Sequence, residues 1–367
     1  MVVDMFYVDV FLNFLSCFYS TIMFLTTKDL IYIFEVKVLF GMINYMSKSQ
    51  YGDFIEQTTG KLFSGLWDSY NDQLFEDSVS LFNARLDLSG FDKNWFKDKV
   101  CLDAGCGGGR ATIGMARWGA KKAVGVDVGG EGLENAKIRA STLDNVEFKE
   151  ASIIELPFRD NEFDMVWCSG VVHHTIDQYK AINEISRVTK VGGHLYLLIY
   201  ATGGMRWPLI QLLRPVAEKI GQDSIDRAIA IAELPANKRR TFLDDLFVPK
   251  IDFYDFSRLR TELETRGFGD LKRWDVDCRL DHEANLESYR QDLESLLKIF
   301  SVNTDALVDG RPDISQLFMF ARNIVRSTVD VILSFENSVN RDEISLESAM
   351  DIVIGQGHHR VIATKVS

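Results

Sequence analysis

Short runs of β-branched and other apolar residues alternate with helix-like stretches over residues 99–201. The short runs predict strands and the stretches between them predict helices. Strands that alternate with helices form βαβ units, so this region predicts a parallel sheet covered by helices on both faces. The predicted strands are 100–103, 123–127, 146–148, 163–168 and 193–200, and the predicted helices are 111–118, 131–140 and 179–189.

The segments on either side of this region predict further helices and two more strands. Residues 51–94 carry apolar positions at helical spacing, and 209–232 and 256–266 are also helix-like. Residues 271–278 and 359–365 predict strands, with a long helix-like stretch over 286–350 between them. A glycine-containing turn is expected at 190–193, before the fifth strand.

Residues 1–45 differ in composition from the rest of the chain. They are crowded with aromatic and aliphatic residues, and 10–27 carry no charge. Three interpretations are open: a membrane anchor through residues 10–27, a start of translation at Met46, or a helix docked on the protein. Asp4 and Asp9 stand where a signal peptide has positive charges, which argues against that fourth possibility.

Charge and cysteine content narrow the class of partner. The net charge of −12 disfavours nucleic acid, because a phosphate backbone is bound by a basic face. The five cysteines are scattered and the histidines lack metal-ligand spacing, so neither a disulfide framework nor a metal site is expected. A cytoplasmic location is expected, with membrane anchoring through 10–27 as the alternative. Membrane contact is expected only if residues 1–45 are translated and inserted.

A glycine-rich segment lies between two acidic residues at the ends of predicted strands. Asp103 ends the first strand, the glycines follow, and Asp127 ends the second strand. Glycines let a backbone approach a ligand closely, and the helix that follows offers free N–H groups. An acid at the end of the second strand can accept hydrogen bonds from ribose hydroxyls. This layout predicts a site for a nucleoside-containing ligand at the carboxyl edge of the sheet.

The same segment departs from a dinucleotide-binding fingerprint. Counting from Gly105, Arg110 stands where the last glycine of G-x-G-x-x-G is required. Asp103 would lie beside a pyrophosphate, whereas its charge suits an ammonium group. Both departures disfavour a nicotinamide-dependent oxidoreductase and favour S-adenosylmethionine as the ligand.

With these residues, the chain resembles the class I, Rossmann-like S-adenosylmethionine-dependent methyltransferases of the small-molecule type (type 11-like domain). The resemblance covers about 99–200 and implies a doubly wound α/β fold. Its sheet would have seven mostly parallel strands with an antiparallel last strand, N-terminal helices and a helical insertion before that strand. It also implies methyl transfer to a small-molecule or lipid-like acceptor. The matching segments are 103–109, 125–127, 156–158, 163–166, 169–174 and 184–193.

On this resemblance the chain is expected to divide into six parts. Residues 1–45 would form the hydrophobic extension, 46–98 a helical cap and 99–201 the cofactor-binding core. Residues 202–284 would supply substrate-side helices with the sixth strand, 285–358 the helical insertion and 359–367 the last strand. The helical insertion together with residues 203–246 is the expected place for a substrate lid.

The resemblance also assigns cofactor contacts residue by residue. The Gly105–Gly107 backbone would hold the amino-acid end of the cofactor, Asp103 its ammonium group and Asp127 its ribose. Val128 would lie against the adenine. Ser152 stands where the family often has an acid for the adenine amine, which leaves that contact open. The expected cofactor-binding residues are Asp103, Ala104, Gly105, Cys106, Gly107, Asp127, Val128, Ser152, Ile153 and Ser169.

His173 and His174 are the candidate catalytic residues. They follow the fourth strand, on the side where the cofactor's sulfonium would point, and histidine suits a general base at neutral pH. The doublet recurs in the family across unlike substrates, so a structural or gating role is the alternative. A non-catalytic, S-adenosylmethionine-binding regulatory module is also open, and the sequence does not indicate an oligomeric state.

Overall fold

The computed structural model describes residues 48–68, 70–274, 285–305, 307, 311 and 313–367. The chain divides after Phe54, and Ile55–Ser367 forms one compact unit. The predicted extension over 1–45, with its three interpretations, lies outside the described residues. Among the residues that are described, no helix is long and apolar enough to cross a membrane.

A seven-stranded sheet organises this unit, in the order β3-β2-β1-β4-β5-β7-β6. The pairs among the first five strands are parallel, and β7 runs antiparallel to both of its neighbours. The mostly parallel sheet with an antiparallel last strand is therefore confirmed. The strands are β1 Val100–Ala104, β2 Lys122–Asp127, β3 Val146–Glu150, β4 Phe163–Ser169, β5 Thr189–Tyr200, β6 Phe268–Arg273 and β7 His358–Lys365.

Helices cover both faces of the sheet because successive strand residues point to opposite sides. Cys101 packs in one apolar cluster with α4 (Asp72–Ser89) and α5 (Arg110–Arg117). Leu102, the next residue of β1, packs in another with α7 (Gln178–Val188) and α11 (Phe256–Glu264). Burial on both faces explains the apolar runs in the inner strands β1, β2 and β4.

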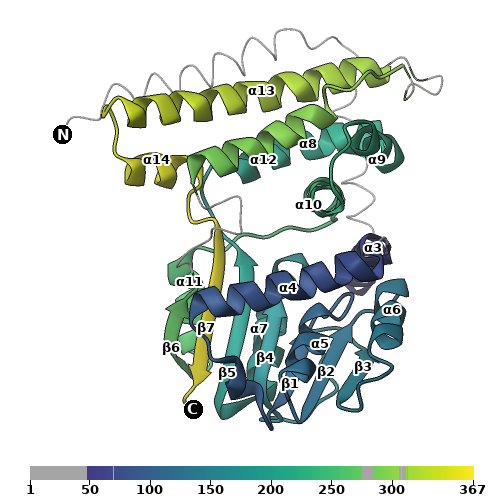
Figure 1. Cartoon of the computed structure of the whole chain (residues 1–367), viewed down its shortest axis with the longest axis vertical. Helices are drawn as coiled ribbons and strands as arrows, with labels where there is room; N and C mark the ends of the chain where they lie inside the picture. Colours follow the sequence, from purple (N-terminus) through teal and green to yellow (C-terminus); the bar gives the residue numbers. More distant parts are fainter. Residues whose placement is uncertain (1–47, 69, 275–284, 306, 308–310, 312) are drawn as a thin grey trace. The chain divides into compact units, whose positions relative to one another are not determined.

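A second layer of helices has an apolar core of its own, separate from the two clusters on the sheet (Figure 1). It includes Leu213, Leu293 and Phe318 from three of these helices, together with Leu62 and Leu66 of α3 (Lys48–Asp68). The helices are α8 Arg206–Ile220, α9 Gln222–Ile231, α10 Ala236–Phe247, α12 Leu286–Ile299, α13 Asp313–Asn340 and α14 Leu346–Val353.

The segment that follows β5 lies beside the segment that precedes β7. After β5, the Ala201 N–H donates to the Gly357 carbonyl at 3.1 Å, and the Gln356 N–H donates to the Thr202 carbonyl at 3.2 Å. The segments on either side of the helical layer are thus joined by backbone hydrogen bonds. The last strand then enters the sheet between β5 and β6, as expected for an insertion into the final hairpin.

Four predicted elements differ from the structure, and one helix was not predicted. The turn expected at 190–193 lies inside β5 as a bulge opposite Asp164, because Thr189 pairs with Phe163 and His194 with Met165. The helix expected over 209–232 is two helices, separated at Gly221, which has a φ of 95°. The stretch 286–350 holds three helices, and α10 was not predicted at all. The sixth strand begins at Phe268 rather than 271, and residues 275–278 of the prediction lie outside the described residues.

Candidate functional site

The glycine loop after β1 is held against β2 by its own backbone. The N–H groups of Gly105 and Cys106 both donate to the Val126 carbonyl, at 2.8 and 2.9 Å. Gly105 has a φ of 81°, and a Cβ there would lie 2.3 Å from Cγ2 of Val171. The loop after β4 therefore lies directly against the glycine loop, which leaves no room for a side chain between them.

Asp103 lies at the start of this loop and is almost fully buried. Its Oδ2 accepts hydrogen bonds from the backbone N–H and the hydroxyl of Thr112, at 2.9 and 2.8 Å. Burial raises the pKa of the carboxyl to about 6, although the Thr112 bonds favour the charged form. Both Thr112 bonds go to Oδ2, so Oδ1 is the oxygen that can serve a cationic ligand.

Asp127, the last residue of β2, accepts hydrogen bonds from the glycine loop and from the residue that follows it. Its Oδ2 accepts from the Gly107 N–H at 2.8 Å and its Oδ1 from the Val128 N–H at 2.9 Å. Burial raises the pKa of this carboxyl, and the two backbone bonds oppose that effect. The acid is thus positioned by the same loop that would carry the ligand's amino-acid end.

Helix α3 lies against the part of the site expected to hold adenine. A Cβ on Gly60 would meet Cγ2 of Val128 at 2.8 Å, which shows how closely the helix packs there. The Ser152 hydroxyl donates to Oε1 of Glu56 at 2.6 Å. A carboxylate therefore does stand at this position, but it comes from α3 and not from the loop after β3. Nothing in the local sequence around Ser152 predicts Glu56.

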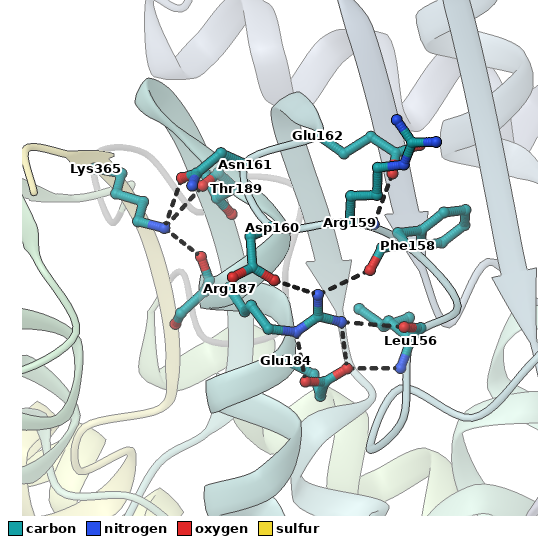
Figure 2. Close-up of polar contacts among 11 residues, drawn as sticks. Leu156, Phe158, Arg159, Asp160, Asn161, Glu162, Glu184, Arg187, Thr189 and Lys365 are labelled. Carbon is teal, nitrogen blue, oxygen red and sulfur yellow. Dashed lines mark hydrogen bonds and ion pairs between the residues drawn. The ribbon is translucent and has the colours of Figure 1, made fainter.

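The loop that carries Ser152 and Ile153 is braced by Arg187 of α7 (Figure 2). Its guanidinium donates to the carbonyls of Leu156 and Phe158 and to the carboxylates of Asp160 and Glu184. Glu184 in turn accepts from the Leu156 N–H at 2.8 Å. This brace gives a structural reason for the matching segments 156–158 and 184–193: they fix the loop beside the adenine position.

His173 and His174 lie in a 3₁₀ turn, η2 (Val172–His174), directly after β4 and both are buried. The His173 ring stacks on Tyr200 at 3.7 Å, and Tyr200 stacks on Trp207 at 4.4 Å. Burial lowers the pKa of His174 to about 4 and that of His173 well below its usual value. Both imidazoles are therefore neutral at physiological pH.

Asp244 of α10 completes the surroundings of the histidines. It accepts a hydrogen bond from the Tyr200 hydroxyl at 3.2 Å, and its Oδ1 lies 3.8 Å from Nε2 of His174. Sequence reasoning missed both Tyr200 and Asp244, since only the packing of α10 on the end of β5 brings them to η2. Their acidic and aromatic character alone does not set them apart from other residues in the chain.

The other predicted site residues lie at the same edge of the sheet. Ala104 and Ser169 end β1 and β4, and Ile153 is buried beside the loop after β3. Cys106 is buried and its thiol pKa is raised well above the usual value by burial, so the thiol is not reactive. Over the described part of the chain, no cluster of His, Cys, Asp and Glu could hold a metal ion.

Comparison with known proteins agrees with this geometry. Residues 102–197 match the family model of a methyltransferase domain. The 27-O-demethylrifamycin SV methyltransferase of Amycolatopsis mediterranei is 31% identical over 42% of this chain and 58% of its own length. The ubiquinone biosynthesis O-methyltransferase of Alkalilimnicola ehrlichii is 29% identical over 48% of this chain and 81% of its own length.

A third relative, the 2-phytyl-1,4-naphtoquinone methyltransferase of Nostoc, is 29% identical over 33% of this chain and 58% of its own length. The chain thus spans little more than half the length of two of these three relatives. The matched segment runs from β1 into β5, which includes the glycine loop, Asp127 and the histidine turn. Residues 102–197 are thus a match to a methyltransferase domain, and the seven-stranded sheet of this order is built around that segment.

Proposed function

We propose that the protein transfers a methyl group from S-adenosylmethionine to a small-molecule or lipid-like acceptor. The observation that carries the proposal is the pair of acids, the buried Asp103 and the half-buried Asp127, held on either side of a glycine loop by hydrogen bonds to that loop and its helix. The small-molecule acceptors in the names of the rifamycin and ubiquinone relatives support the acceptor class. The absence of a nucleic-acid partner and a cytoplasmic location stay predictions.

The residues present fit this cofactor. Oδ1 of Asp103 can receive an ammonium group, and Asp127 at the end of β2 can receive ribose hydroxyls. Gly105 keeps a Cβ out of the space next to Val171, so the backbone can lie close to the ligand. When bound, S-adenosylmethionine supplies an electrophilic methyl group on a positively charged sulfur. The protein's part is then alignment, which can supply about 7–11 kcal/mol of the barrier.

Two other functions are weighed on the same residues. A nicotinamide-dependent oxidoreductase is disfavoured by Asp103, whose buried carboxyl would lie beside a pyrophosphate, and by Arg110 in place of the third glycine. A non-catalytic cofactor-binding module shares every feature of the cofactor site. It differs in one measurable respect, since it would bind the cofactor without forming a methylated product.

The test is calorimetric titration of S-adenosylhomocysteine into the full chain and into its Asp127→Ala variant. We expect micromolar binding that the substitution weakens at least tenfold, because a charged acceptor is lost. Glu134→Ala, in an exposed ion pair on α6 (Glu131–Arg139), is the control and should bind normally. Well-folded protein that binds no S-adenosylhomocysteine would refute the proposal. Binding followed by a screen with radiolabelled S-adenosylmethionine then separates an enzyme from a binding module.

A further inference from the structure

His174 and Asp244 face each other through atoms that lack hydrogen-bond partners. Nε2 of His174 lies 3.8 Å from Oδ1 of Asp244, and in the described part of the chain neither atom has a hydrogen-bond partner. The other ring nitrogen, Nδ1, lies 2.8 Å from the Lys250 carbonyl oxygen. A carbonyl can only accept, so Nδ1 carries the proton of the neutral ring and Nε2 presents a lone pair.

At neutral pH, the two atoms that face each other are both hydrogen-bond acceptors. Burial lowers the pKa of His174 to about 4 and raises that of Asp244 to about 6. At neutral pH the imidazole is therefore uncharged and the carboxylate is ionised. Two buried lone pairs that face each other without a proton between them are unfavourable, and a donor group from a ligand would relieve this.

We propose that the hydroxyl group of the methyl acceptor binds at this place and donates its proton to Nε2 of His174. Asp244 is then a positioning residue, because it lies where it can stabilise the imidazolium that forms. The inference rests on the proposed methyltransferase function and adds to it the base, its partner and the chemical class of the acceptor.

The charged groups around the pair favour a hydroxyl over a cationic amine. Arg240, Arg214 and Arg206 lower the pKa of Asp244, and Arg214 and Lys250 lower that of His174. Asp245 acts in the opposite direction on the histidine, and its ion pair with Arg206 offsets both charges. The effect therefore rests on Arg214 and Arg240. A further cation would be repelled by these groups, whereas the same positive field lowers the pKa of an acceptor hydroxyl.

The aromatic surroundings favour a flat, unsaturated acceptor. Tyr200 is stacked between His173 and Trp207, and the Phe63 ring lies 5.5 Å from His174. Aromatic faces of this kind pack well against planar rings. A phenol or enol O–H is also more acidic than an alkanol O–H, so it loses its proton to the weakly basic imidazole more readily as the oxygen attacks the methyl group.

The chemical step balances without any further reactant. A bond forms between the acceptor oxygen and the methyl carbon as the carbon–sulfur bond breaks, and the sulfur keeps that electron pair. The hydroxyl proton passes to Nε2 of His174, which becomes an imidazolium beside the Asp244 carboxylate. Release of that proton to solvent restores the neutral ring.

The first test uses histidine labelled with ¹⁵N in the full chain, with S-adenosylhomocysteine present and phenol as the probe. We expect the neutral Nδ1–H form of His174 from pH 8 down to about 5, with phenol shifting the Nε2 resonance. Anisole, which lacks the O–H, should bind at least about tenfold more weakly when this resonance is followed in a titration, a difference of about 1.4 kcal/mol. A protonated His174 at neutral pH, or equal binding of phenol and anisole, would overturn the proposal.

The second test is the Asp244→Asn variant, whose amide can donate to Nε2. Because a donor then faces the lone pair, we expect the melting temperature to rise by about 2 °C and the affinity for phenol to fall about tenfold. If the pair were a structural salt bridge, the substitution would lower the melting temperature, which would also overturn the proposal. Asp226→Asn, in a partly exposed pair with Arg239, controls for the loss of a carboxylate elsewhere.

The two proposals fail in different ways. If S-adenosylhomocysteine binds but phenol leaves His174 unchanged, only the acceptor site is refuted. If S-adenosylhomocysteine does not bind, the methyltransferase function is refuted, and with it the role assigned here to His174. The tautomer of His174 and the melting temperature of Asp244→Asn are measured independently of either ligand.

Discussion

The Ser152 hydroxyl donates a 2.6 Å hydrogen bond to the Glu56 carboxylate, across 96 residues of sequence. This contact joins the loop after β3 to helix α3, at the position where related enzymes often place an acid for the adenine amine. The carboxylate at this position thus belongs to a different element of the fold. Ser152 uses its proton to orient that carboxylate through Oε1, and we predict that Oε2 of Glu56 accepts a hydrogen bond from the adenine amine.

From this contact we predict that Glu56→Ala weakens binding of S-adenosylhomocysteine by about tenfold. A hydrogen bond between a charged acceptor and an amine contributes about 1.5–3 kcal/mol, which is consistent with a loss of this size. The measurement is calorimetric titration of the full chain. Ser152→Ala should have a smaller effect, because it only releases Glu56 from its hydrogen bond.

S-inosylhomocysteine, which lacks the adenine amine, provides the control for this role. The wild type should prefer S-adenosylhomocysteine, and Glu56→Ala should bind the two ligands nearly equally. If the variant keeps the wild-type preference, then Glu56 does not contact the amine and acts only by holding α3 in place.

A second prediction concerns the pH dependence that Asp103 imposes. Its pKa in the folded protein is about 6, above the usual value of 3.8, so folding favours the protonated form. Stability of the ligand-free protein should therefore fall as pH rises from about 4 to about 6. Cofactor affinity should change in the opposite direction, rising by up to tenfold per pH unit below 6, because only the ionised carboxylate pairs with the ammonium group.

Calorimetry between pH 5 and 7.5 measures the affinity, and thermal melting over pH 4–7 measures the stability. Asp103→Asn should lose the Asp103 contribution to both slopes, while any contribution of Asp127 persists, since burial raises the pKa of that carboxyl too. An affinity that stays constant from pH 5 to 7.5 in the wild type would contradict the assignment of Asp103 to the ammonium group.

A third prediction tests the contact between the glycine loop and the loop after β4. In Gly105→Ala the new Cβ would lie 2.3 Å from Val171 Cγ2, at a backbone φ of 81°. We expect a loss of about 2–4 kcal/mol in the free energy of unfolding by urea, from backbone strain and steric overlap together. Gly170→Ala is the matched control, because its φ is 78° but no atom lies within 4 Å of the added Cβ.

The control variant should lose only the backbone part, about 1 kcal/mol. Adding Val171→Ala to Gly105→Ala should recover most of the steric part, because both Cγ atoms are removed and only the Cβ contact at 2.9 Å stays. Equal losses in Gly105→Ala and Gly170→Ala would mean that the two loops do not constrain each other.

The cofactor half of the site could be predicted from the sequence because its residues are local to two strand ends. Asp103 and Asp127 end adjacent parallel strands, so the topology alone brings them together. Glu56 and Asp244 could not be predicted, since each reaches the site from a helix outside the matched segment. No pattern in the sequence records the packing that brings α3 to Ser152 or α10 to His174.

The helical layer was predicted in outline but not in its divisions. Its helix-like stretches were recognised, yet Gly221 and the breaks around α13 divide them into separate helices. Helix α10 was missed because its first half is polar, and its buried residues, among them Phe242 and Leu246, lie in the second half. The sequence predicts a turn at 190–193, where the structure has a bulge, because paired glycines are typical of turns and of bulges.

The last prediction concerns Arg206, the first residue of α8, which is buried in the helical layer. Its guanidinium pairs with Asp245 of α10 and Asp292 of α12, and its backbone N–H donates to the Tyr289 hydroxyl at 2.7 Å. Lys238 also pairs with Asp292, so this carboxylate keeps one partner without Arg206. Arg206→Met should nevertheless lower the free energy of unfolding by about 3–5 kcal/mol, because Asp245 becomes a buried charge without its guanidinium partner.

Urea unfolding measures this loss of stability. Lys137→Met is the control, because it breaks the exposed pair with Glu134 and should change stability by less than about 0.5 kcal/mol. A loss for Arg206→Met no larger than that of the control would mean that the ion cluster does not hold α8, α10 and α12 together. In that case Asp244, which precedes Asp245 on α10, would owe its position beside His174 to the apolar packing of Phe242 and Leu246 instead.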